Sequence, residues 1–176
     1  IAYLKEKGIK NPLEKSTSKE HKHADTFSGC PGLKMMDFRR EQNPAAEEKT
    51  VSGRMSQLRQ WPIQIMLVPP FAPYLNNADV LIAADCVPFA YADFHEDLLR
   101  EKVLLIGCPK LDDVEIYQQK LTQILKNNNI KSITYAHMEV PCCFGLVSII
   151  QSAISTSGKD VPLKEAIISI KGKRLR

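Results

Sequence analysis

Five short apolar runs place the strongest limits on what this chain can fold into. The runs are "IQIMLV", "DVLIAA", "KVLLIG", "SITYAHMEV" and "EAIISI", at residues 63–68, 79–84, 102–107, 132–140 and 165–170. They are rich in β-branched residues, and the central runs show no clean alternation of apolar and polar positions. This pattern is typical of strands buried on both faces of a parallel sheet. The sequence therefore predicts a mostly parallel sheet of four to five strands.

Helical signals lie between these runs. The segment 111–129 offers Asp112 or Asp113 as an N-cap, then an approximate apolar stripe, then an asparagine run as a stop. A more buried helix is predicted over residues 144–158 and a third over 91–100. Strands that alternate with helices predict a three-layer, doubly wound, Rossmann-like α/β domain with right-handed crossovers.

The first third of the chain differs in composition from the rest. Residues 1–60 are mostly polar, and we expect an initial helix followed by an extended arm that carries the "GCPG" loop around Cys30. Residues 61–176 then form the α/β domain. The chain opens without a Met, inside the predicted helix, so we expect a fragment or a processed product. His21 and His23 lie in the arm, where solvated loop positions are favoured over zinc ligands.

Bulk properties argue against several classes of function. No run approaches the roughly 18 apolar residues of a membrane span, and the N-terminus lacks the layout of a secretory signal. The net charge of +4 is modest and no aromatic residue interleaves with a basic run, so neither a membrane nor a nucleic acid is expected as a partner. Neither G-x-G-x-x-G nor G-x-x-x-x-G-K-[ST] is present, so no nucleotide cofactor is predicted.

Cysteines carry the most specific chemistry in the chain. Five cysteines without a secretory signal favour a reduced, cytoplasmic setting over a disulfide framework. Cys86 follows the second apolar run, Cys108 the third, and Cys142 and Cys143 the fourth. In a parallel sheet these strand ends share one edge, where open α/β sheets build ligand sites. We therefore expect the thiols to converge there, with Cys30 brought in by the arm.

A thiolate site at this edge has three interpretations. Structural zinc sites use close C-x₂₋₄-C pairs, whereas Cys30, Cys86, Cys108 and Cys142 are separated by 56, 22 and 34 residues. Such spacings favour a [4Fe–4S] cluster held from several strand ends. A catalytic thiol is the third interpretation, in which His137 could pair with Cys142. Adjacent cysteines are poor disulfide partners, so one of the pair 142–143 is expected to complete the site, and the sequence leaves open which.

Acidic and histidine side chains flank these cysteines. Four lie around Cys86 and two precede the cysteine pair: Asp85, Asp93, His95, Glu96, His137 and Glu139. They could serve as proton donors or as hydrogen-bond partners around a cluster. Helix capping and surface solvation are favoured for His95 and Glu96. The sequence assigns no catalytic residue and no oligomeric state.

Five motifs together resemble a known family. They are "GCPGLKMMDF", "RQWPIQIMLVPPFAPY", "LIAADCVPFAYADFH", "IGCPKLDD" and "AHMEVPCCFGL", within residues 1–173. In this order they are similar to iron–sulfur proteins of anaerobic bacteria and archaea, usually described as 4Fe-4S ferredoxins or iron–sulfur cluster-binding proteins. Members typically carry an N-terminal two-cluster domain with C-x₂-C-x₂-C-x₃-C-P runs, which this chain lacks, so the resemblance is to the C-terminal portion.

The resemblance implies a [4Fe–4S] cluster and electron transfer with a redox partner protein or an upstream ferredoxin domain. Ligation by four cysteines leaves no open iron, which favours an electron relay or an accessory redox role. The fifth cysteine and His137 keep substrate chemistry open, so whether the chain is an enzyme is left undecided.

Overall fold

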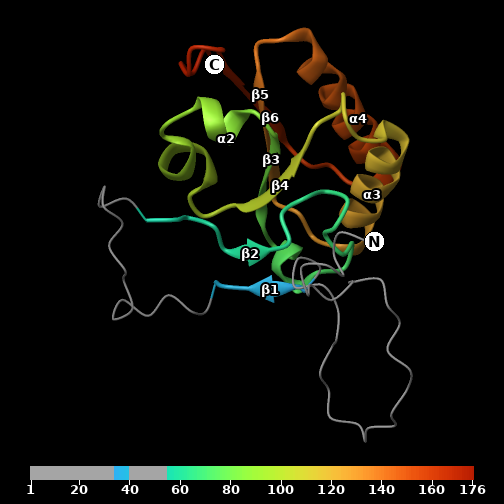
Figure 1. Ribbon diagram of the computed structural model, residues 1–176. Helices are drawn as coiled ribbons and strands as arrows, with labels where there is room; N and C mark the ends of the chain where they lie inside the picture. The colour runs from blue at the N-terminus through green and yellow to red at the C-terminus, as the bar shows by residue number, and fades with distance from the viewer. Residues whose placement is uncertain (1–33, 40–54) are drawn as a thin grey trace, which may run out of the picture.

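A computed structural model describes residues 34–39 and 55–176 (Figure 1). The elements in chain order are β1 (Met36–Asp37), β2 (Gln60–Trp61), η3 (Pro73–Leu75), β3 (Asp79–Ala84), α2 (Val87–Ala90), η4 (Phe94–Leu99), β4 (Val103–Gly107), α3 (Val114–Asn127), β5 (Ser132–Met138), α4 (Pro141–Ser157) and β6 (Leu163–Ile168). The helix predicted at the start of the chain and the loop around Cys30 lie outside the described residues.

The central sheet has the strand order β4-β3-β5-β6, and every neighbouring pair is parallel. The predicted Rossmann-like α/β fold is therefore confirmed. In the register of the sheet, Ile82 on β3 lies between Leu105 on β4 and Tyr135 on β5. The chain passes from β3 to β4 on one side and then crosses back over β3 to β5. The carboxyl ends of β3 and β5 thus flank the topological switch point, where open α/β sheets bind ligands.

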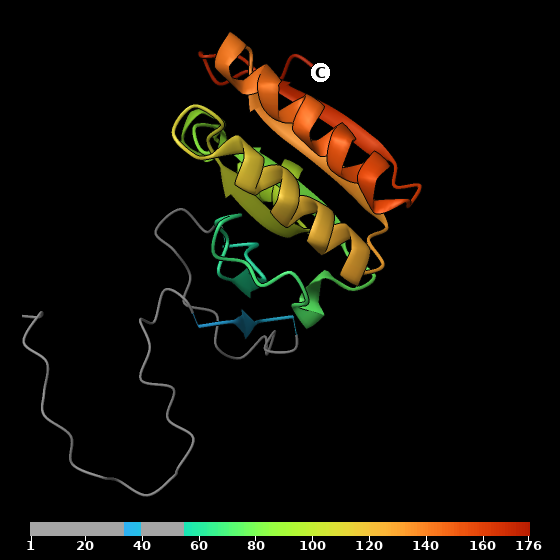
Figure 2. The ribbon, with the colours of Figure 1, turned by 90° about the vertical axis from the view of Figure 1, so that its right-hand side faces the viewer.

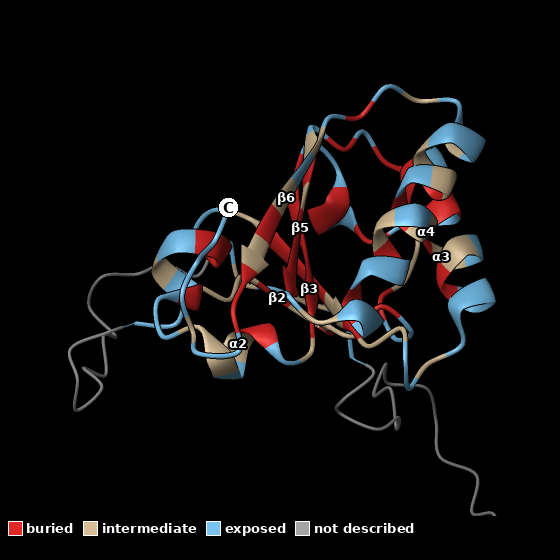
Figure 3. Cartoon of the chain, turned by 90° about the horizontal axis from the view of Figure 1, so that it is seen from above, coloured by how far each residue is buried: buried red, intermediate tan, exposed pale blue. Residues whose placement is uncertain are grey.

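Helices cover both faces of the sheet, as Figures 1 and 3 show. α3 and α4 lie side by side on one face (Figure 2), and α2 with the π-helix η4 lies on the other. Alternation along β3 divides the core, because Val80 and Ile82 pack with α3 and α4 whereas Leu81 and Ala83 pack with α2 and η4. Burial on both faces explains why the strands are continuous apolar runs in the sequence.

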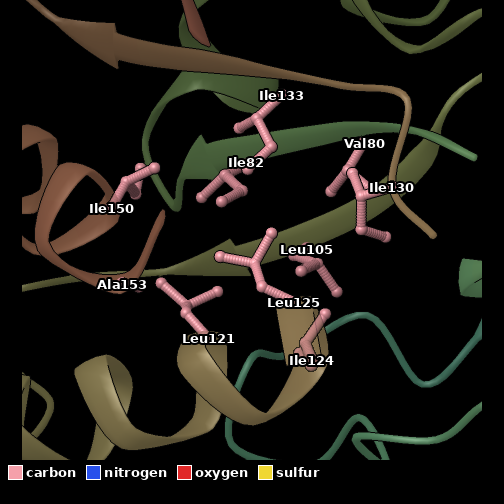
Figure 4. A pocket seen from close by; sticks show the side chains of 10 residues that line it. All are labelled: Val80, Ile82, Leu105, Leu121, Ile124, Leu125, Ile130, Ile133, Ile150 and Ala153. Carbon is pink, nitrogen blue, oxygen red and sulfur yellow. The ribbon is translucent and has the colours of Figure 1, made fainter. Parts of the chain in front are cut away.

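The core between the sheet and helices α3 and α4 leaves a small gap (Figure 4). Its volume is about 10 Å³, and it is lined by Val80, Ile82, Leu105, Leu121, Ile124, Leu125, Ile130, Ile133, Ile150 and Ala153. These side chains offer no hydrogen-bond partner to a water molecule, so a gap of this size stays dry. This part of the molecule is a packed core, and ligand chemistry has to lie elsewhere.

The prediction of a first strand at residues 63–68 is wrong. Gln64 forms an isolated parallel bridge with Ile106 at the edge of β4, and the chain then turns away. The N–H groups of Leu67 and Val68 both donate to the carbonyl oxygen of Gln64, at 2.9 and 3.0 Å, and so make a turn instead of a strand ladder. Two prolines follow, and a proline has no N–H to continue a ladder. The apolar run here reflects burial and not extended backbone.

The helices agree with the predicted segments, with shifted ends. α3 begins after Asp113, whose carboxylate accepts hydrogen bonds from the N–H groups of Glu115 at 2.9 Å and Ile116 at 3.3 Å. α4 ends at Gly158, whose φ of 72° glycine adopts without strain. It begins at Pro141, earlier than predicted, and so contains both adjacent cysteines. No helix in the described ranges has the length and apolar character to cross a bilayer.

Candidate thiol site

Four cysteines gather at the carboxyl ends of β3, β4 and β5. Cys86 precedes α2, Cys108 follows the last residue of β4, and Cys142 and Cys143 lie in the first turn of α4. These three strands are consecutive in the sheet, so the four residues share one edge and lie on both sides of the switch point. We call these four cysteines the thiol site. Cys30 lies outside the described residues.

The four side chains differ in burial. Cys86 and Cys142 are exposed, Cys108 is half-buried and Cys143 is buried, and all four are free thiols. Burial, together with the neighbouring side chains of Cys142 and Cys86, raises the pKa of Cys143 to about 11. Cys143 is therefore a neutral thiol near pH 7, and Cys142 is the accessible member of the adjacent pair.

The start of α4 explains why the pair is oriented in this way. Sequence reasoning placed the pair after a strand, whereas the structure winds it into a helix. Pro141 occupies the first helical position, where a missing N–H has no cost. Val140 at the N-cap provides no side-chain acceptor, and the first turn holds no acidic residue. The positive end of the helix dipole, next to Cys142, is thus left without a side-chain anion.

Tyr135 on β5 lies directly beneath this turn. Its hydroxyl donates a hydrogen bond to the carbonyl oxygen of Cys143 at 2.7 Å. Burial raises the pKa of Tyr135 far above its ordinary value, and the charges of Cys143, Cys108 and Cys142 raise it further. Cys86 in turn contributes to the raised pKa of Cys143. Cys142 and Cys86 are therefore close enough to act electrostatically on Cys143, and Cys108 lies close enough to act on Tyr135.

The thiol site is a group of neighbours and not a preformed single-ion site. Within residues 34–39 and 55–176, no three side chains of His, Cys, Asp or Glu are arranged to hold one metal ion. The site instead offers four thiols, which are soft metal ligands, at one edge of the sheet, and the thiols of Cys86 and Cys142 are exposed to solvent.

His137 is buried beneath α4, and its two ring nitrogens contact oxygen atoms and not the thiols. Its ring stacks on Tyr135 with centroids 4.8 Å apart and meets Phe144 edge-on at 5.0 Å. Nε2 lies 2.7 Å from Oε1 of Glu165, and Nδ1 lies 2.8 Å from the carbonyl oxygen of Met138. Both ring nitrogens thus contact groups other than Cys142, the partner that the catalytic-thiol interpretation requires.

Three of the other flanking side chains make structural hydrogen bonds. The backbone N–H of Gln57 donates to Nδ1 of His95, and its side-chain amide donates to Oε1 of Glu96, both at 3.1 Å. Glu139 accepts the N–H of Ile170 at 2.9 Å. These contacts tie together loops around the edge of the sheet and leave the thiol chemistry to the cysteines.

Two carboxylates lie among the thiols. Oδ1 of Asp85 is buried and has no hydrogen-bond partner in the described part of the chain. Burial raises the pKa of Asp85, and the negative charge of Asp112 raises it further. Asp112 accepts hydrogen bonds from the N–H of Cys108 at 3.2 Å and from the hydroxyl of Tyr117. Sequence reasoning missed this role of Tyr117, because its spacing in the apolar stripe marks only a core position.

A second hollow, around the edge strand β6, has no cysteine in its lining. Its volume is about 580 Å³, and its lining mixes charges of both signs, including Asp97, Lys102, Lys164 and Arg174. Asp97 and Arg174 pair with each other at 2.8 Å. Arg176 likewise lies 3.7 Å from Glu165, so each acid of the lining pairs with an arginine, and the basic side chains outnumber the acidic ones through Lys102 and Lys164. The thiol site remains the stronger candidate, because four thiols at one sheet edge are the more specific donor set.

Fold and site together define a Rossmann-like α/β protein with thiols at its switch point. Residues 72–176 match the Rossmann-like domain family, and the chain belongs to this family. An uncharacterized protein of Archaeoglobus fulgidus is 34% identical over 118 residues, which cover 67% of this chain and 83% of that protein. No solved structure matches the chain.

These comparisons overturn the resemblance to 4Fe-4S ferredoxins and iron–sulfur cluster-binding proteins. The matching family is a Rossmann-like domain and the relative is uncharacterized, so no ferredoxin or iron–sulfur family is indicated. The assignment to that family is wrong. Most of its supporting motifs lie where strands end and helices begin, as "LIAADC" does at the end of β3 and "IGCPK" at the end of β4. They therefore also mark the architecture of an α/β sheet.

Proposed function

We propose that this domain binds a [4Fe–4S] cluster at the thiol site and uses it for electron transfer or in an accessory redox role. The observation that carries the proposal is the gathering of four free cysteines at the carboxyl ends of three consecutive strands. Core cysteines behave as small hydrophobes, yet Cys86 and Cys142 are exposed. The proposal rests on this site and not on family membership.

The donor chemistry of the thiol site fits such a cluster. Iron–sulfur clusters take cysteine thiolates as ligands. The exposed Cys86 and Cys142 follow β3 and β5, and the half-buried Cys108 follows β4, the other neighbour of β3. Each iron of a cubane binds its own thiolate, so the ligands need not converge on one point as the ligands of a single ion must. Thiols that are neighbours without a common focus are compatible with this requirement.

The charges around the site bear on its redox properties. The uncapped start of α4 places the positive end of a helix dipole beside Cys142, which would stabilise added electrons. Asp112 acts in the opposite sense, since its carboxylate lies beside Cys108 and disfavours added electrons. Net charge and hydrogen bonding around a cluster tune its reduction potential. Nearby carboxylates therefore support a role at low potential.

The burial of the cysteines suggests how the ligands are divided. We assign Cys86, Cys108 and Cys142 as ligands, because their thiols are exposed or half-buried. The fourth ligand is Cys30 or Cys143. When bound, the cluster would accept and release one electron, which a redox partner protein would exchange. A reducing cytoplasm would keep the thiols available.

Anaerobic reconstitution with ferrous iron and sulfide tests the proposal. We expect brown protein with four irons and four sulfides per chain, a thiolate-to-iron absorbance band and an electron paramagnetic resonance signal after reduction. Cys86→Ser, Cys108→Ser and Cys142→Ser should each lose the cluster. Cys143→Ser, which removes the buried thiol of the adjacent pair, decides the fourth ligand, because it should lose the cluster if Cys143 is that ligand. It should retain the cluster if Cys30 is the fourth ligand.

Three outcomes would contradict the proposal. Wild-type protein that stays colourless after reconstitution would show that the thiol site binds no cluster. Colourless protein with one zinc per chain would indicate a structural zinc domain. Metal-free protein in which one thiol is alkylated far faster than the others would indicate a cysteine-dependent enzyme.

A further inference from the structure

We infer that Asp112 and Tyr117 are positioning residues of the thiol site, forming a clamp that holds Cys108 and places a negative charge beside it. The effect on a cluster rests on the proposed function, whereas the holding of Cys108 is a property of the chain itself.

The loop after β4 closes on Cys108. The N–H groups of Leu111 and Asp112 both donate to the carbonyl oxygen of Cys108, at 3.1 and 3.0 Å. The N–H of Cys108 donates to Oδ2 of Asp112 at 3.2 Å. Both backbone polar groups of Cys108 are thus bound within its own loop, which fixes the direction in which its side chain leaves the backbone.

Tyr117 ties this loop to the core. Its hydroxyl donates to the same Oδ2 of Asp112, and its ring is fully buried among the side chains that pack beneath α3 and α4. A Cβ on Gly107 would lie only 2.1 Å from that hydroxyl. The hydroxyl therefore occupies the space that a side chain at Gly107 would need. The loop is held by a helix that is itself packed on the sheet, and this is the kind of support that keeps a site precise.

The folding of α3 does not explain the carboxylate at Asp112. Asp113 already caps the helix through its bonds to Glu115 and Ile116. The carboxylate of Asp112 instead accepts the N–H of Cys108 at 3.2 Å and the hydroxyl of Tyr117. We therefore attribute the position of Asp112 to the thiol site and not to the cap of the helix.

The clamp has two consequences for Cys108. It restrains the backbone, so the thiol approaches its neighbours from a fixed position. It also uses the N–H of Cys108 to bind a carboxylate, so that this N–H is not available to a sulfur atom. Fewer N–H···S bonds and more nearby negative charge both lower the reduction potential of a cluster.

Tyr117→Phe tests the restraint in protein without a cluster. The variant keeps the ring and loses the hydroxyl, so the fold should persist. We expect the alkylation rate of Cys108 by iodoacetamide to rise about tenfold relative to that of Cys142, which is the change expected from losing one hydrogen bond. Amide hydrogen exchange at Cys108 should accelerate in parallel. Tyr74→Phe is the matched control, because Tyr74 is equally buried and its hydroxyl has no partner in the described part of the chain. It should change neither rate.

Asp112→Asn tests the charge in reconstituted protein. Asparagine keeps an oxygen acceptor for Cys108 and Tyr117 but is neutral. We expect the clusters that form in this variant to have a midpoint potential more positive than that of wild type. Tyr74→Phe should leave the potential unchanged.

The two sets of measurements separate this inference from the proposed function. If wild type binds no cluster but Tyr117→Phe selectively exposes Cys108, the clamp holds and the proposed function fails. If the cluster forms and neither variant changes the reactivity of Cys108, its exchange or the potential, the clamp is wrong. An equal rise at all four thiols in Tyr117→Phe would indicate general loosening and would also overturn it.

Discussion

Nε2 of His137 on β5 lies 2.7 Å from Oε1 of Glu165 on β6, and this contact joins the two neighbouring strands. The imidazole is fully buried, whereas the glutamate side chain is 27% exposed. Nδ1 faces the carbonyl oxygen of Met138, so both ring nitrogens meet oxygen acceptors. Because the ring also stacks on Tyr135, the pair supports the sheet beneath the first turn of α4.

Removing the acceptor from this pair should destabilise the protein. We expect Glu165→Ala to lower the free energy of unfolding by about 1–3 kcal/mol, since it leaves a buried donor without a partner. Glu165→Gln keeps an oxygen acceptor and should lose less. Urea unfolding followed by circular dichroism measures the change. Lys164→Ala, at an exposed position of the same strand, should change stability by no more than about 0.5 kcal/mol. Equal effects of Glu165→Ala and Lys164→Ala would contradict the role of the pair.

Two glycine substitutions should have opposite signs. Gly107→Ala places a Cβ 2.1 Å from the hydroxyl of Tyr117, and we expect it to destabilise the protein by about 1–3 kcal/mol through overpacking. Gly145→Ala lies within α4, where nothing stands within 4 Å of the new Cβ. It should stabilise the protein by up to about 1 kcal/mol through helix propensity. Melting temperatures of the two variants measure the contrast, and a Gly107→Ala protein as stable as wild type would refute the close approach.

The N-cap of α3 should contribute about 1 kcal/mol to the free energy of unfolding. Asp113→Ala removes the acceptor for the N–H groups of Glu115 and Ile116, and we expect a loss of about 1 kcal/mol. Asp113→Asn keeps a capping oxygen and serves as the control, with stability close to wild type. Denaturant midpoints compare the two. If alanine were tolerated as well as asparagine, the capping bonds would not contribute to stability.

Alkylation should distinguish the adjacent cysteines. The pKa of Cys143 is raised to about 11, so its thiol keeps its proton near pH 7, and the thiolate is the species that reacts. In metal-free protein we expect Cys86 and Cys142 to be alkylated well before Cys143. The rate at Cys143 should then rise about tenfold per pH unit from about pH 7 to about pH 10. Mass spectrometry of the labelled peptides gives each rate. A rate at Cys143 that levels off below about pH 9 would contradict the raised pKa.

Much of the fold follows from local sequence pattern. Strands β3, β4 and β5 are evident because each is buried on both faces, which requires apolar side chains at successive positions. The edge strand β6 is evident from its apolar second half, since Lys164 near its start is exposed. The same reasoning predicted that Cys86, Cys108, Cys142 and Cys143 follow strands and therefore share an edge. It failed at residues 63–68, where a buried turn has the same apolar composition as a buried strand.

The amino-acid sequence by itself determined the α/β class, the positions of β3, β4, β5 and β6, and the placement of the cysteines at the ends of strands, because periodicity and turn residues act over a few neighbouring positions. Only the tertiary structure decided which cysteine of the adjacent pair is buried, since this depends on where α4 starts at Pro141 and what it packs against. It also decided the contacts of Asp112 with Tyr117 and of His137 with Glu165. Such pairs depend on the strand order and on how the helices pack, and these are set by contacts between residues far apart in the chain.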